Sequence, residues 1–213
     1  MENPSLDSRG PVIYINVFPG TGKPIIAKHL VSLFQTDAVK LVHHQLLINP
    51  TDAVLDRDQP GYQELCRNIR QTVLNSLAEN TATHSSAYIF TDFQSANELG
   101  SEVSLEYFNC AVQRGCHFIP ITPRCSEEEN LKRLTSDDRA THGKLVDVEL
   151  AKQLRKDDGL FTFVGYCNRR TLNVTKFSAE EVAVEIMHHV IKIAPAMGLR
   201  VRDQESAPLQ ENI

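Results

Sequence analysis

The stretch that most restricts the fold of this chain runs from residue 12 to residue 30, VIYINVFPGTGKPIIAKHL. An apolar run with strand character leads into a Gly-rich turn, which is followed by a lysine and a segment with a helical pattern. Glycines permit a tight backbone turn, and the free N–H groups at the start of a helix attract anions. The stretch therefore predicts a strand, a phosphate-binding turn and a helix in succession.

The turn fits the phosphate-binding pattern G-x-x-x-x-G-K-[ST] in part. Gly22 and Lys23 occupy the G-K positions, whereas Val17 stands at the first glycine and Pro24 at the final Ser or Thr. In a complete loop the hydroxyl at that last position ligates Mg²⁺. Pro24 has no hydroxyl and no backbone N–H, although its ring fits the first turn of a helix, so we expect no intact magnesium site. The residues expected to bind phosphate are Gly20, Thr21, Gly22 and Lys23.

The composition limits the kinds of partner. The chain has 213 residues and a formal net charge of -5, and it contains no long run of Lys or Arg. A nucleic-acid groove or a membrane-surface patch needs concentrated positive charge, so neither is expected. No stretch is apolar over the length of a membrane span, and the five cysteines form no C-x-x-C pair of the kind that binds zinc. We expect a cytoplasmic protein with a small-molecule partner.

Apolar β-branched runs alternate with longer helical patterns along the chain, which predicts a parallel sheet with helices on both faces. Ser178 and Glu181 have the spacing of a capping box at the start of a terminal helix. We expect one domain at residues 11–193, flanked by disordered tails at 1–10 and 203–213. The predicted strands are Val12–Val17, Ala38–Val42, Ala87–Thr91, His117–Thr122 and Thr171–Thr175.

The carboxyl end of the predicted strand AYIFT carries the next candidate, Asp92. Ligands of open α/β sheets bind at that end of the strands. Asp92 is predicted either to hold a magnesium-bound water or to act as a general base toward a substrate hydroxyl. An aspartate that caps the turn after the strand is the alternative.

Histidines follow another predicted strand, AVKLV. Adjacent side chains of an extended chain face opposite ways, so at most one of His43 and His44 points toward a pocket at the sheet edge. A histidine whose pKa is near neutral can serve as acid or base. We name His43 as the catalytic candidate, and a structural histidine is the alternative for either residue.

Positive side chains occur in the polar segment LKRLTSDDRATHGKL. A lid uses such groups to neutralise phosphate charge and to exclude water. Arg133 and Arg139 are the catalytic candidates of this segment. Because Asp137 and Asp138 lie among them, a solvated helix end of mixed charge is the alternative.

The order of these motifs resembles that of small P-loop kinases, the group of nucleoside-monophosphate-kinase-like and chloramphenicol-phosphotransferase-like proteins, and most of all short AAA-type P-loop proteins of fungi. The resemblance extends from about Pro11 to Ile193 and rests on INVFPGTGK, LLINP, YIFTDFQS, ENLKRLTSDDR and LNVTKFSAEEVA. It implies a three-layer α/β sandwich in which a five-stranded parallel sheet has the order 2-3-1-4-5, with a small lid at about residues 126–160. It also implies ATP with Mg²⁺ and a small acceptor bound between the second strand and the lid.

The departures from this family lie in the same site. Besides the two changes in the turn, His43 and Gln45 occupy positions where relatives carry Asp and His. Asn173 stands where an Asp is usual in LNVT. These changes remove charge on which phosphoryl transfer depends, so three functions remain open. They are a divergent ATP-dependent kinase of a small metabolite, a nucleotide-independent isomerase, cyclase or lyase on the same scaffold, and a non-catalytic protein that binds a metabolite or another protein.

Overall fold

A parallel sheet forms the centre of the protein. The structure, a computed structural model, describes residues 6–35, 37–134, 152–153 and 159–202. The sheet has five strands in the order β2-β3-β1-β4-β5, which confirms the predicted order. Every neighbouring pair is parallel, and each strand begins and ends within two residues of its predicted position. The strands are β1 (Val12–Asn16), β2 (Val39–His43), β3 (Ala87–Asp92), β4 (Phe118–Arg124) and β5 (Arg170–Asn173).

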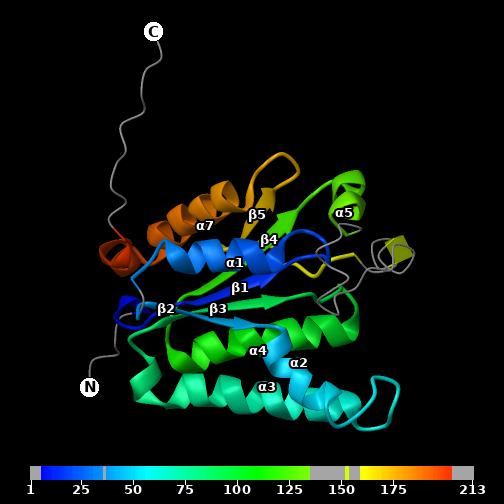
Figure 1. The fold of residues 1–213 in the computed structure, drawn as a ribbon. Coiled ribbons are helices and arrows are strands. Elements are labelled where there is room, and N and C mark those ends of the chain that lie inside the picture. Colours follow the sequence, from blue (N-terminus) through cyan, green and yellow to red (C-terminus); the bar gives the residue numbers. More distant parts are fainter. Residues whose placement is uncertain (1–5, 36, 135–151, 154–158, 203–213) are drawn as a thin grey trace.

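Helices cover both faces of the sheet, so the molecule has the expected three layers (Figure 1). Helices α1 and α7 lie on one face, and α3 and α4 lie on the other. Short helix α2 follows β2, and α5 follows β4 at the carboxyl edge of the sheet. The helices are α1 (Lys23–Ser32), α2 (Gln45–Asp52), α3 (Tyr62–Glu79), α4 (Glu98–Arg114), α5 (Glu127–Leu134) and α7 (Ala179–Ile193), with 3-10 helices η1 (Leu6–Ser8), η2 (Thr81–Thr83) and η4 (Pro195–Arg200).

Strand side chains alternate between two apolar cores because helices cover the sheet on both faces. Ile13 and Ile15 of β1 belong to the core under α1 and α7. Val12 and Tyr14 belong to the core under α3 and α4. All five residues of β1 are buried, so the central strand that leads into the Gly-rich turn is held from both sides.

The predicted capping box is present at the start of α7. Ser178 Oγ accepts a hydrogen bond from Glu181 N at 3.2 Å, and the Glu181 carboxylate accepts one from Ser178 N at 2.8 Å. The two bonds satisfy N–H groups that the first turn of a helix otherwise leaves without partners. The direction of α7 after β5 is therefore fixed by local sequence as well as by packing.

The amino-terminal segment differs from the expected disordered lead-in at residues 6–10. Leu6–Ser8 form η1, and buried Gly10 donates its N–H to His84 O at 2.9 Å. Residues 1–5 and 203–213 of the expected tails lie outside the described residues, as do 135–151 and 154–158 of the expected lid.

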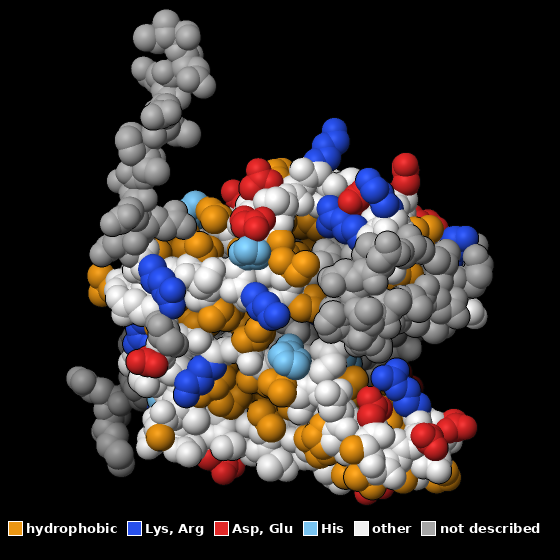
Figure 2. Space-filling model, in the orientation of Figure 1, with side chains coloured by type: hydrophobic (Ala, Val, Ile, Leu, Met, Phe, Trp, Pro, Cys, Tyr) orange, Lys and Arg blue, Asp and Glu red, His pale blue; other side chains and the backbone are white. Residues whose placement is uncertain are grey.

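Charged and apolar side chains are interspersed on the face drawn in Figure 2. The described Lys and Arg side chains of this face are scattered and form no continuous basic surface there. Within the described ranges no helix has the length and apolar character needed to cross a bilayer.

Candidate functional site

The turn between β1 and α1 contains two glycines in the left-handed backbone conformation. Gly22 is the N-cap of α1 with φ 93°, and Gly20 has φ 92°, a left-handed conformation that favours glycine. Ile25 and Ile26 both donate their N–H groups to Gly22 O, at 3.0 and 3.1 Å. Pro24 is accommodated in the first turn, where an N–H needs no intrahelical partner. The positive end of the α1 dipole therefore lies at the loop, beside Lys23.

Helix α5 holds this loop from outside the sheet. Asn130 is 1 % exposed and donates from Nδ2 to Pro19 O at 2.8 Å and to Thr21 Oγ1 at 3.4 Å. Thr21 Oγ1 also contacts Cys125 Sγ at 3.7 Å, and Thr21 N donates to Phe18 O at 3.3 Å. The hydroxyl and the N–H of Thr21 both bond within the protein, and its expected contact with phosphate stays a prediction. In this structure Thr21 supports the loop.

The carboxylate of Asp92 lies at the end of β3 and is 1 % exposed. It accepts four hydrogen bonds, and a carboxylate has about four acceptor positions. The capacity of Asp92 is therefore filled by the protein itself, in a position where a magnesium-bound water was one of the expected partners. The donors are His44 Nδ1 (2.7 Å), Phe93 N (2.7 Å), Gln94 Nε2 (3.0 Å) and Tyr107 OH (3.2 Å).

The surroundings of Asp92 keep it ionised. Burial has the largest single effect and raises the pKa of this carboxyl, but the net pKa lies below the ordinary value because several groups act against burial, first among them the charge and hydrogen bond of His44. The charge of Lys23 and the amide of Gln94 lower the pKa further. Asp92 is therefore an anion throughout the neutral range, and it lies in the field of the loop lysine.

The histidine in contact with Asp92 is His44 and not the named candidate, His43. His43 is the last residue of β2, where it pairs with Thr91 of β3. At His44 the backbone turns helical, with φ -46° and ψ -44°, and begins α2. The alternation of side chains along a strand no longer applies at that point, so the sequence pattern could not identify which histidine faces Asp92. A catalytic role for His43 stays a prediction.

The sequence pattern also gave no indication of Asn16, the last residue of β1. Its side chain is buried and donates from Nδ2 to Gln94 O at 2.9 Å and to Phe161 O at 3.0 Å. Its Oδ1 accepts a hydrogen bond from Gln94 N at 2.8 Å. Asn16 therefore joins β1 to the segment after β3 and fixes Gln94 beside Asp92.

A cavity of about 180 Å³ adjoins the loop on the side of α7. Its wall is largely apolar, with Ile25 of α1 and Phe177 before α7, and Arg133 also lines it. Arg133 donates from Nε to Glu129 Oε1 at 2.7 Å and from Nη2 to Thr175 O at 3.4 Å. Arg133 thus lines the cavity beside the loop, and its catalytic role in a lid stays a prediction. Arg139 is outside the described residues.

The described residues do not fit a protein-ligated Mg²⁺ ion. The hydroxyl position of the loop is Pro24, and the acceptor positions of Asp92 are already filled. No group of three or more His, Cys, Asp or Glu side chains that could hold a metal occurs in the part of the chain that the structure describes. Lys23 and the backbone of the loop do fit an anion such as a nucleotide phosphate.

The chain is similar in fold to solved structures of kinases. No family model and no curated protein matches the sequence. A sugar kinase from Janibacter sp. HTCC2649 has a TM-score of 0.60 at 15 % identity, over 89 % of this chain and 98 % of the kinase. A gluconokinase from Sinorhizobium meliloti 1021 has a TM-score of 0.56 at 10 % identity, over 90 % and 97 % of the two chains. An APS kinase from Mycobacterium tuberculosis, in complex with AMPPNP and APS, has a TM-score of 0.52 at 14 % identity, over 85 % and 98 %. Likeness at these identities concerns the fold alone, and it confirms a P-loop kinase-like fold.

Proposed function

We propose that this protein transfers a phosphoryl group from ATP to a hydroxyl of a small metabolite. The observation that carries the proposal is the pair of His44 and Asp92 beside the loop. The Asp92 carboxylate is bonded to the imidazole at 2.7 Å, and its pKa is lowered by Lys23 as well. The Asp92 carboxylate therefore lies close to both a candidate base, His44, and the loop lysine, Lys23.

The phosphates would bind to the backbone of Gly20 and Gly22 and to the ammonium of Lys23. The cavity beside the loop suits a flat ring, because Ile25 and Phe177 offer apolar walls and Arg133 a planar cation. We assign the base of ATP to this cavity. The names of the solved kinases, one of them in complex with AMPPNP, support the choice of nucleotide.

His44 would act as the general base. Asp92 accepts the proton on Nδ1, which fixes the tautomer in which Nε2 carries a lone pair. The His44 side chain is 25 % exposed, whereas Asp92 is buried, so the opposite edge of the ring is the accessible one. Nε2 takes the proton of the acceptor hydroxyl while its oxygen bonds to the γ-phosphorus, and the bond from that phosphorus to the β-phosphate oxygen breaks to release ADP.

No step of this scheme needs a protein-bound metal ion. Lys23 neutralises phosphate charge, and Arg139 remains the predicted lid arginine that would add to it. Phosphoryl transfer depends on such charge, so we expect slow turnover relative to kinases with an intact magnesium site.

A calorimetric titration with ATP, with and without Mg²⁺, tests nucleotide binding. We expect the wild type to bind ATP in the presence of chelator, and Lys23→Ala to bind at least about tenfold more weakly because it loses a charge-assisted bond to phosphate. The matched control is Lys28→Ala, an exposed lysine of the same helix, which should bind like the wild type. Absence of ATP binding to the wild type at millimolar nucleotide refutes the proposal.

Release of ADP over a panel of small hydroxyl compounds tests the base. Once an acceptor is found, His44→Asn should keep the ATP affinity and lose about 10²- to 10⁴-fold in turnover, the range for removal of a general base. His43→Asn is the matched control and should retain turnover. A result in which His43→Asn loses the activity and His44→Asn keeps it assigns the base to His43 instead.

A second candidate function rests on the filled coordination of Asp92. A His–Asp pair that needs no metal also suits a nucleotide-independent isomerase, cyclase or lyase that works by proton transfer. The calorimetric titration separates the candidates, because this enzyme needs no nucleotide and the wild type would then not bind ATP at millimolar concentration.

A further inference from the structure

A second cavity lies at the edge of the sheet opposite the loop, and we propose that it binds a phosphate-bearing small metabolite. Its volume is about 800 Å³, within the range of about 300 to 1,000 Å³ that is usual for ligand pockets. The proposal does not depend on the function proposed above. It rests on the position, the charge and the fixed walls of this cavity.

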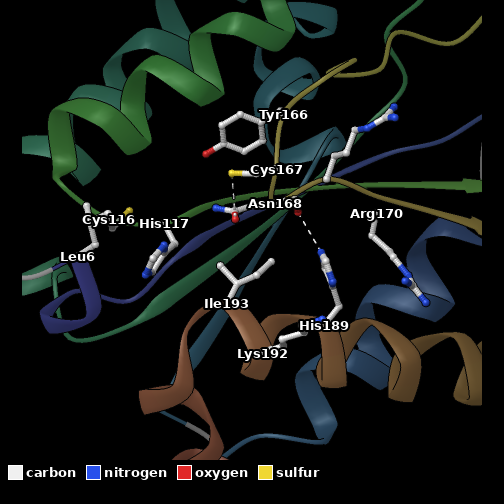
Figure 3. A pocket seen from close by; sticks show the side chains of 11 residues that line it. Leu6, Cys116, His117, Tyr166, Cys167, Asn168, Arg170, His189, Lys192 and Ile193 are labelled. Carbon is white, nitrogen blue, oxygen red and sulfur yellow. Dashed lines mark hydrogen bonds between the residues drawn. The ribbon is translucent and has the colours of Figure 1, made fainter.

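The cavity is separated from the loop by the length of the strands. Cys116 and His117 precede β4, and Asn168 precedes β5, so they lie at the amino ends of these strands. The opposite wall is the last part of α7, where His189 and Ile193 occur one turn apart on one face. Figure 3 shows the His117 and His189 side chains on either side of Ile193, with Asn168 across from it.

The permanently charged side chains that line this cavity are all positive. Arg169, Arg170 and Lys192 contribute to it together with two histidines, and no Asp or Glu occurs among its described lining residues. The chain as a whole has a net charge of -5, so the charge of the cavity lining is opposite in sign to that of the whole chain. A local concentration of positive charge attracts anions.

These cations are not neutralised by strong ion pairs. Arg170 Nη2 is 3.9 Å from Glu185 Oε2, and both side chains are about half exposed, so this pair is weak. Within the described residues neither Arg169 nor Lys192 has an ion-pair partner. Burial raises the pKa of the Cys116 thiol to about 11, so the thiol adds no negative charge at neutral pH.

Hydrogen bonds hold the walls of the cavity in place. His189 Nε2 donates to Asn168 O at 2.9 Å, since a carbonyl can only accept (Figure 3). Asn168 in turn donates from Nδ2 to Phe118 O at 3.3 Å. With Nε2 bonded to the carbonyl, Nδ1 of His189 donates to a phosphate oxygen only when the ring is protonated. A pre-organised wall lowers the entropic cost of binding.

The chemistry of the lining selects the class of ligand. Arg and Lys donors suit the oxygens of a phosphate group, and apolar Leu6 and Ile193 suit an organic part. The volume is larger than a lone phosphate requires. We therefore assign the cavity to a phosphorylated metabolite, with free phosphate as the source that the experiment has to distinguish.

Proton NMR of the histidine rings tests this site without confusion from the loop. The experiment uses the full chain carrying Lys23→Ala, because the loop also attracts anions, and the resonances of His117 and His189 are assigned from His117→Asn and His189→Asn. Inorganic phosphate and ribose 5-phosphate are the two probes, titrated at constant pH. We expect both resonances to shift saturably with each probe, and at lower concentration with ribose 5-phosphate. If the titration midpoints for inorganic phosphate and ribose 5-phosphate are equal, the organic part adds no binding and free phosphate is the ligand. Resonances that stay fixed at millimolar probe overturn the proposal.

A pair of variants distinguishes a built site from a general electrostatic field. Arg170→Gln/Lys192→Gln should weaken binding at least about tenfold, because each lost charge-assisted bond has an effect of roughly that size. Lys28→Gln/Arg67→Gln removes the same total charge from exposed side chains elsewhere and should leave the midpoint unchanged. Equal weakening by the two pairs overturns the proposal. All four substituted residues are exposed. Circular dichroism is the control that checks whether the variants are folded.

Discussion

Arg114, the last residue of α4, offers the sharpest test of how this fold is held together. Its side chain is fully buried, and its guanidinium donates five hydrogen bonds that all go to neutral oxygens. The guanidinium also lies 5.2 Å from the centre of the Tyr88 ring. One side chain thus joins the amino-terminal segment, α3 and the connection into β3. The acceptors are Gly10 O (3.3 Å), Leu77 O (2.6 Å), Thr83 Oγ1 (2.7 Å), Thr83 O (2.7 Å) and Ser86 O (3.0 Å).

The cost of Arg114→Met follows from what the substitution leaves behind. Leu77 O keeps the hydrogen bond that Thr83 Oγ1 donates to it at 3.0 Å. Thr83 O likewise keeps the hydrogen bond that Ser86 N donates to it at 3.2 Å. The carbonyl oxygens of Gly10 and Ser86 lose the arginine, and each buried acceptor without a donor costs about 1 to 3 kcal/mol. Methionine recovers part of this cost because it removes a buried charge that is expensive to desolvate. We expect a net loss in the free energy of unfolding of about 2 to 3 kcal/mol, a sizeable share of a typical stability of about 5 to 15 kcal/mol.

Urea unfolding followed by far-ultraviolet circular dichroism measures this loss, since the chain has no tryptophan. Arg67→Met is the matched control: Arg67 is 60 % exposed and its contact with Glu106 is 3.5 Å, so it should lose less than about 1 kcal/mol. Arg114→Lys keeps the charge but lacks the planar guanidinium, so its loss of unfolding free energy should lie between those of Arg114→Met and Arg67→Met. If the free energy of unfolding of Arg114→Met stays within about 1 kcal/mol of the wild-type value, the hydrogen bonds of the guanidinium do not hold these segments together.

Two further predictions concern ionisation. The folded-state pKa of Asp92 is lowered, so its contribution to stability is present above about pH 4, the unfolded value, and is lost as pH falls toward the folded value. The difference in unfolding free energy between the wild type and Asp92→Asn should therefore shrink below about pH 4 in urea titrations, and a difference that grows there contradicts the assignment. Burial raises the pKa of Cys110 to about 12 and that of Cys116 to about 11, whereas Cys167 is exposed. Ellman's reagent should react fast with one thiol per native chain, and Cys167→Ser should abolish that phase; a persisting fast phase identifies another reactive thiol.

The sequence predicted those parts of the fold that depend on local patterns. Strand positions follow from runs of apolar β-branched residues, and the start of α7 follows from the Ser178 capping box. The strand order came from the resemblance to P-loop kinases. The pattern did not reveal α2, because Pro50 lies inside this helix and proline ordinarily argues against a helix interior.

Of the candidate site, the sequence indicated the residues of the local loop motif but not the contacts between separate elements. Gly20, Gly22 and Lys23 form a contiguous motif whose geometry is set within a few residues. The partners that fix Asp92 come from different elements: His44 begins α2 and Tyr107 belongs to α4. Such contacts depend on how helices cross the sheet, and no spacing rule in the sequence encodes them. The cavity at the opposite edge is built in the same way from separate elements, and its residues form no motif.

Pro24 at the hydroxyl position of the loop pattern and the burial of Asp92 are consistent with each other. A carboxylate that serves a metal-bound water needs water and an unused acceptor position, and Asp92 is 1 % exposed with its positions filled. Because Pro24 supplies no hydroxyl ligand for Mg²⁺, an accessible Asp92 carboxylate would lack the second protein ligand of a magnesium site. Its charge instead orients the imidazole of His44, and a carboxylate at residue 44 would repel it across the 2.7 Å contact. In our proposal the loop binds the anion and the acid–base capacity lies on a histidine.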